Sequence, residues 1–168
     1  DASRYLLSDS DSLAPLLEIR KGFDQWVCER PVRRLDGAPQ YLADPRANDI
    51  DMLVIRENSE GEYVDSGSRF KIGEPEEFAL QTAIHTRRGV ERILRFGFDM
   101  ASRRRNRLTM VTKSNAQRYG YVMWDEILAE VSADYPAIES DRQHADAAAM
   151  KTRKPRGWTK RKITPWLL

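Results

Sequence analysis

Several side chains in this sequence are of the types that bind carboxylates, transfer protons and hold metal ions. Planar guanidinium groups bind carboxylates through two parallel hydrogen bonds, so a ligand with two or three carboxylates needs several of them. The candidates stand on three different predicted elements and are Arg20, Arg30 and Arg56. Tyr63 could donate a proton, Lys113 could accept one, and Asp146 could bind a metal ion. Each also has an ordinary role on a protein surface, so residue types alone leave both interpretations open.

The central stretch of the chain is residues 51–63, DMLVIRENSEGEY. An apolar run over residues 52–55 predicts a buried strand, and the charged, glycine-containing segment that follows carries Arg56 and Tyr63. Buried strands of α/β proteins deliver polar groups to the mouth of a sheet in this way. A strand followed by a solvated turn is the alternative.

The elements around this stretch alternate between helices and strands. Helical spacing predicts a helix from near Ser12, capped by Ser10 and Asp11. Further helices are predicted at 87–103, with Thr86 as cap, at 119–133, and from 144 onward. Strands are predicted at 31–35, 78–84, 108–112 and 137–140, a loop at 36–48, and a loop or projecting β-arm at 64–77. This order predicts an α/β fold with a mixed sheet.

Composition restricts the class of protein. The 168 residues suit one domain, are 40% hydrophobic and 32% charged, and contain no run of the roughly 20 apolar residues that span a bilayer. Because no signal-peptide pattern opens the chain and Cys28 is the single cysteine, we expect a cytoplasmic protein with no membrane association and no disulfide. Cys28 is expected to pack rather than react.

Charge is distributed unevenly along the chain. Residues 151–168 hold seven of the 28 Lys and Arg and none of the 26 Asp and Glu, so the preceding body is mildly acidic. The arginines of residues 103–107 follow a predicted helix, and cations there complement the helix dipole. No aromatic platform is interleaved with them, so nucleic-acid binding is the weaker interpretation.

Five ordered motifs resemble the β-decarboxylating dehydrogenases of 2-hydroxy acids, the isocitrate/isopropylmalate dehydrogenase family. They are LLEIRKGFDQWVCERP, IRENSEGEY, HTRRGVERI, TKSN and HADAAAM. Within the family, the segments FDQWV, NDIDMLVIRENSEGEY and TKSN most resemble the tartrate and D-malate dehydrogenase branch. The resemblance covers roughly residues 12–150. It implies an isopropylmalate dehydrogenase-like α/β fold: a mixed sheet flanked by helices, with a projecting β-arm, here incomplete.

The resemblance also implies roles for individual residues. In an NAD-dependent oxidative decarboxylation of a (2R)-hydroxy acid, Lys113 takes the hydroxyl proton and Tyr63 protonates the carbon that loses CO₂. The three arginines hold the carboxylates of the substrate, such as tartrate, D-malate or 3-isopropylmalate. Asp146 is a ligand of Mg²⁺ or Mn²⁺, and Asn115 contacts the cofactor. Active sites shared across a two-fold interface imply a homodimer, with helices 119–133 and 144–150 near the interface.

One face of the first predicted helix gives information about the substrate. Leu13, Leu16 and Leu17 precede Arg20 by one and two turns, on the face that contacts the variable part of the substrate in the family. An apolar face argues against isocitrate, whose extra carboxylate would need polar partners. Plain core leucines are an equally good interpretation.

The ends of the chain depart from the family pattern. Residues 1–11 are interpreted as a remnant of a longer N-terminal segment, and 12–150 as the substrate-binding and dimerisation region. Residues 151–168 lack the family's further motifs and are predicted to be a disordered basic tail, from a frame change or a foreign end. The chain would then be weakly active or inactive alone. The alternative is an inactive subunit that acts as a dimerisation or binding module.

Overall fold

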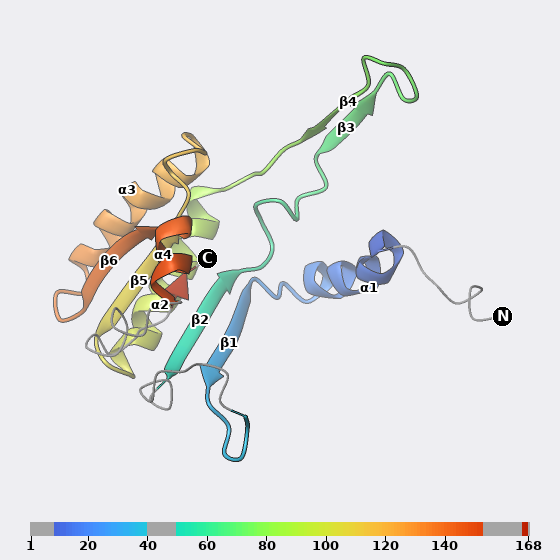
Figure 1. The fold of residues 1–168 in the computed structure, drawn as a ribbon. Helices are drawn as coiled ribbons and strands as arrows, with labels where there is room; N and C mark the ends of the chain where they lie inside the picture. The colour runs from blue at the N-terminus through green and yellow to red at the C-terminus, as the bar shows by residue number, and fades with distance from the viewer. Residues whose placement is uncertain (1–8, 40–49, 153–165, 168) are drawn as a thin grey trace. The chain divides into compact units, whose positions relative to one another are not determined.

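The computed structural model describes residues 9–39, 50–152 and 166–167 (Figure 1). The chain divides into two compact units, one of residues 1–26 with 58–84 and one of residues 27–57 with 85–168. Part of the loop predicted at 36–48 lies outside the described residues. So do residues 1–8, 153–165 and 168, which belong to the predicted terminal segments. Within the described part of the chain, no helix is long and apolar enough to span a membrane.

A five-stranded mixed sheet forms the centre of the second unit, as predicted. Its order is β1-β2-β7-β5-β6, with β1 antiparallel to β2 and all other neighbours parallel (Figure 1). The strands are β1 (Val27–Arg33), β2 (Asp51–Glu57), β5 (Arg107–Thr112), β6 (Glu139–His144) and β7 (Trp166–Leu167). Central parallel strands must be covered on both faces, and helices cover them here.

One face of this sheet packs against α2 (Arg87–Ser102), which in turn packs against α3 (Gly120–Ala133). Thr86 caps α2 as predicted, because its side chain accepts a hydrogen bond from the Gly89 N–H at 3.0 Å. The apolar stripe of α2 is fully buried against the sheet and α3. It comprises Val90, Ile93, Leu94, Phe98 and Ala101.

The opposite face carries α4 (Ala145–Thr152). Ala148 of α4 is buried against Val111 of β5, with Val54 of β2 and Ala145 packed around them. Because side chains alternate along a strand, residues 54 and 111 point away from the α2 side that Ile55 and Met110 fill.

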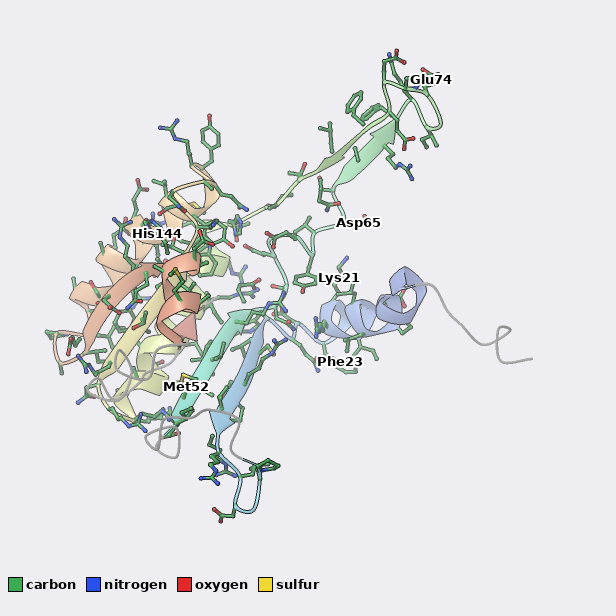
Figure 2. All side chains as sticks on the ribbon, viewed as in Figure 1. Lys21, Phe23, Met52, Asp65, Glu74 and His144 are labelled. Atoms are coloured by element: carbon green, nitrogen blue, oxygen red, sulfur yellow. The ribbon has the colours of Figure 1, made fainter. Side chains whose placement is uncertain are left out.

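The first unit contains α1 (Asp9–Gly22) and the predicted β-arm. The arm pairs β3 (Gly67–Phe70) antiparallel to β4 (Phe78–Gln81), and Glu74 lies at its tip (Figure 2). The rings of Phe70 and Phe78 stack with centroids 4.8 Å apart, yet both side chains are 41% or more exposed. Leu16 of α1 is also exposed, so it is not a core leucine.

Several predicted boundaries were wrong. Helix α1 begins at Asp9 rather than Ser12, and helix α4 begins at Ala145 rather than His144. Strand β1 begins at Val27 rather than Pro31, and strand β6 begins at Glu139 rather than Ala137. Strand β4 ends at Gln81 rather than Ile84, and Ile84 forms only an isolated bridge to Gly61. Strand β6 is an edge strand whose limits follow its pairing with β5 rather than its hydrophobicity.

Two side-chain predictions also need correction. The helical spacing of residues 119–133 predicts Val122 on the inward face, but Val122 is 36% exposed. Trp124 is buried instead, beside the ring of His85. The arginines after α2 do more than complement its dipole, since Arg104 and Arg105 pair with Asp51, and Arg107 pairs with Glu139.

Candidate active site

Lys113 and Asp146 meet at one end of the sheet in the second unit. The Lys113 Nζ atom donates a hydrogen bond to Asp146 Oδ2 at 2.6 Å. The register explains the contact, because β5 and β6 are parallel and Thr112 lies opposite His144, so both strands end at the same level. Lys113 follows one strand, and Asp146 lies in the first turn of the helix that follows the other. The side chains are 34% and 73% exposed, so both can be reached by a ligand.

Arg30 and Arg56 share a face of the same sheet. Arg56 lies opposite Cys28, and Arg30 lies opposite Val54. Directly opposed residues of an antiparallel pair point to the same side, and so do residues two apart on one strand. Both arginines therefore project on the face of Val54, on which α4 packs.

Lys113 lies two residues after Val111, which points to the same face. The fold thus places four predicted site residues on the α4 face of one sheet. They are Arg30, Arg56, Lys113 and Asp146. Three cations and one carboxylate on one face can bind an anion that has more than one carboxylate.

Asn115 lies in the turn that follows Lys113, and its side chain is exposed. Together with Ser114 it lines a hollow of about 810 Å³ between α3 and β6. Asp125 and Arg142 line the same hollow and form an ion pair there. An exposed amide at the rim of a hollow can contact a bound molecule through both its carbonyl and its amino group.

Arg20 and Tyr63 belong to the first unit. Arg20 lies in the last turn of α1 and is half-buried, and its backbone carbonyl accepts a hydrogen bond from the Gln25 N–H at 2.8 Å. Tyr63 follows Gly61, whose φ of 72° favours glycine and whose N–H donates to the Ile84 carbonyl at 2.8 Å.

Asn58 holds these two segments of the first unit together. Its backbone N–H donates to the Trp26 carbonyl at 2.9 Å, and its side-chain Nδ2 donates to the Gln25 carbonyl at 3.0 Å. The side chain is buried, so replacing it would leave a backbone carbonyl without its partner. Sequence reasoning did not select Asn58, although a polar residue directly after a buried strand was a usable signal.

The described residues contain no ready-made cluster of metal ligands. Among residues 9–39, 50–152 and 166–167, no group of three His, Cys, Asp or Glu side chains converges on one point. Asp146 can provide one oxygen ligand, and Mg²⁺ is commonly held by one or two carboxylates with water and substrate supplying the rest.

The family description for isocitrate/isopropylmalate dehydrogenases matches residues 2–157 of this chain. The chain belongs to this family. A probable tartrate dehydrogenase/decarboxylase of Agrobacterium vitis is 48% identical over 141 residues, which is 83% of this chain and 39% of the relative. The decarboxylating D-malate dehydrogenase of Escherichia coli K12 is 46% identical over 132 residues, and the tartrate dehydrogenase/decarboxylase of Pseudomonas putida is 43% identical over 132 residues.

This family member spans only about two fifths of the length of such relatives. Among solved structures, the isocitrate dehydrogenase of Methylococcus capsulatus matches with a TM-score of 0.77 at 29% identity, over 90% of this chain and 42% of that one. The family fold is therefore present over a partial region, and the family resemblance predicted from the five motifs is confirmed.

Proposed function

We propose that this chain carries the substrate-binding part of an NAD-dependent decarboxylating dehydrogenase that acts on a (2R)-hydroxy dicarboxylic acid. Tartrate and D-malate are the favoured substrates, because the similar relatives bear these names, and 3-isopropylmalate is a further candidate. The observation that carries the proposal is the α4 face of the sheet, where two arginines share one side with the Lys113–Asp146 pair.

Each residue on that face has a role in this reaction. Arg30 and Arg56 bind substrate carboxylates through bidentate hydrogen bonds. Lys113 accepts the proton of the substrate hydroxyl group while the hydrogen on the same carbon leaves as hydride. The product then loses CO₂ from the carbon next to the new carbonyl group.

In the first unit, Arg20 is the third carboxylate-binding residue and Tyr63 donates a proton to the carbon that has lost CO₂. Asn58 is a positioning residue for both, because it connects the segment after α1 to the segment that leads to Tyr63.

The residues present fit a Mg²⁺ or Mn²⁺ ion in part. Asp146 would supply one oxygen ligand in place of its bond to Lys113, and Asn115 would contact NAD. When bound, the metal ion polarises the hydroxyl oxygen and NAD accepts the hydride.

A homodimer is part of the proposal, and the β-arm supports it. A two-stranded hairpin by itself is marginally stable in water. Its exposed apolar residues would gain stability by packing against a second copy of the arm. They are Phe70, Ile72, Phe78 and Leu80.

The second candidate is an inactive subunit that acts as a dimerisation or binding module in the cytoplasm. The exposed apolar residues of the arm favour it. A sedimentation experiment that shows a clean monomer, without metal or substrate dependence, would count against both candidates.

Activity separates the two candidates. The purified chain is mixed with NAD, Mn²⁺ and D-malate or tartrate, and NADH formation is followed by absorbance. NADH formation that is lost in Lys113→Met and retained in Arg103→Met, a matched exposed control at the end of α2, supports the enzyme. No NADH from D-malate, tartrate or, in a further run, 3-isopropylmalate, together with a stable dimer, favours the binding module.

A further inference from the structure

The hollow between α3 and β6 lies on the opposite face of the sheet from the candidate active site. In the parallel register of β5 and β6, Arg142 lies beside Met110, and side chains that lie beside each other in a ladder point to the same face. Met110 is buried on the face that α2 covers, whereas Lys113 and Asp146 belong to the α4 face. Apart from the contact of Asn115 with NAD, the hollow therefore has no role in the proposed reaction.

Two regular elements form the walls of the hollow. The lining residues of α3 recur at helical spacing and share one face of the helix, and those of β6 alternate and share one face of the strand. The α3 wall includes Val122, Asp125 and Ala129, and the β6 wall includes Ser140, Arg142 and His144. The volume of about 810 Å³ is within the range of small-molecule sites, which is about 300–1,000 Å³.

An ion pair between the two walls leaves one carboxylate oxygen without a partner. Arg142 Nη1 of β6 donates a hydrogen bond to Asp125 Oδ2 of α3. The Asp125 side chain is 10% exposed, and its other oxygen, Oδ1, is buried with no hydrogen-bond partner. A buried acceptor without a donor destabilises the structure that contains it. Because the terminal torsion of an aspartate side chain is broad, rotation of the carboxylate can turn this oxygen toward a donor in the hollow.

Arg142 presents the opposite charge beside this oxygen. Its side chain is 56% exposed, and its bond to Asp125 is its one hydrogen bond within the part of the chain that the structure describes. A guanidinium group carries further N–H donors on Nε and Nη2, and these fit a planar carboxylate. A ligand in the hollow therefore meets a buried acceptor and an exposed donor fork next to each other.

These neighbouring charges restrict the kind of ligand. A simple anion would pair with Arg142 but would face the carboxylates of Asp125 and Glu126, and a simple cation would face Arg142. A ligand with an ammonium group and a carboxylate on neighbouring atoms is complementary to both charges at once. Val122 and Ala129 on the α3 wall offer an apolar surface next to them.

We propose that the hollow binds a free α-amino acid with an apolar side chain. The ammonium group of the ligand donates to Asp125 Oδ1, its carboxylate accepts hydrogen bonds from Arg142, and its side chain packs against the apolar part of the α3 wall. The site does not use the residues of the α4 face, so this proposal and the proposed reaction can fail independently.

Calorimetric titration of the full chain at neutral pH tests the proposal with three probes that share one side chain. They are L-norvaline, pentanoate, which lacks the ammonium group, and butylamine, which lacks the carboxylate. We expect saturable binding of norvaline that is about tenfold or more tighter than that of either analogue, because each analogue loses a charge-assisted bond. Competition of NAD with norvaline would assign the hollow to the cofactor and overturn the proposal.

A pair of variants locates the binding. Arg142→Met removes the donor fork, and Arg87→Met is the matched control, because Arg87 forms an equally exposed ion pair with Glu130 of α3 outside the hollow. Norvaline affinity should fall about tenfold or more in Arg142→Met and stay unchanged in Arg87→Met. If Arg142→Met does not fold, Ala129→Trp decides, because its indole fills the hollow from an exposed helix position and should abolish binding.

Three results overturn the proposal. They are no saturable binding of norvaline to the wild-type chain, an analogue that binds as tightly as norvaline, and a norvaline affinity that Arg142→Met or Ala129→Trp leaves unchanged.

Discussion

Replacing Asp51 with asparagine should weaken the second unit by a predictable amount. The carboxylate pairs with Arg104 at 2.7 Å and also with Arg105, while the Arg105 bond to the backbone carbonyl survives the change. Asp51 is half exposed and the arginines about a quarter exposed, and pairs of this kind contribute about 0.2–1 kcal/mol each. We therefore expect Asp51→Asn to lower the free energy of unfolding by about 1 kcal/mol.

This effect depends on pH in a definite direction. The hydrogen bond from Arg104 is the largest cause that holds the pKa of Asp51 below its ordinary value of 3.8, against burial that raises it. A lowered pKa in the folded state stabilises the fold fully above the pKa of the unfolded state, and the contribution is lost as the pH falls through the folded-state pKa. The difference between wild type and variant should therefore be constant near neutral pH and shrink below about pH 4.

Urea unfolding followed by circular dichroism measures both quantities. A loss of about 1 kcal/mol moves the midpoint by about 0.5 M at an unchanged slope of about 2 kcal/mol per M. High salt should reduce the difference. Glu139→Gln removes the partner of Arg107 at the other edge of the sheet and serves as a matched control with a smaller expected loss. A loss for Asp51→Asn no larger than for Glu139→Gln, or one that persists in acid, would refute this reasoning.

Three further changes have expected outcomes. Gly120→Ala places a Cβ 2.5 Å from His85 Cδ2, so we expect a loss of about 1–3 kcal/mol in thermal or urea unfolding. Burial is the largest cause that raises the pKa of Tyr135 above its ordinary value of 10.0, and the hydrogen bond to Asp99 is the next. The wild-type protein should therefore lose stability as the pH rises above 10, whereas Tyr135→Phe should lack this loss, and unfolding curves at alkaline pH measure the difference. Phe78→Ser should weaken the proposed homodimer in sedimentation, and Glu74→Ser at the arm tip should leave it unchanged.

The helices and strands that were predicted well carry their signal locally. The apolar stripe of α2 repeats at helical spacing and Thr86 caps it, so neither depends on distant contacts. The core strand β5 is a short apolar run between charged residues and was equally readable. For residues 64–77, whose polar sequence has no helical period, a loop or a projecting β-arm was predicted, and the structure has the arm.

The features that were missed depend on pairing between distant segments. Strand β7 lies in the basic segment that was predicted to be a disordered tail, and it pairs in parallel with both β2 and β5. The edge strand β6 is polar and takes its limits from β5. Trp124, rather than Val122, is buried, and its indole N–H donates to His85 Nδ1 at 3.2 Å.

The residues of the candidate site could be selected from local sequence, whereas the contacts between them could not. Arg30, Arg56, Lys113 and Asp146 were selected from motifs, but the direct bond between the last two follows from the parallel register of β5 and β6. The buried Asn58 was missed because its role lies in two carbonyl groups more than 30 residues away.

Binding of a hydroxy dicarboxylate to the α4 face is the most direct test of the central claim. Calorimetric titration of the chain with D-malate in the presence of Mn²⁺ measures it, whether or not the chain is active. A charge-assisted bond contributes about 1.5–3 kcal/mol, so Arg56→Met should weaken binding by about tenfold or more, while Arg103→Met should not. Saturable binding with this pattern is the predicted result. Equal affinity in wild type and both variants, or no binding of D-malate or tartrate at all, would contradict the assignment.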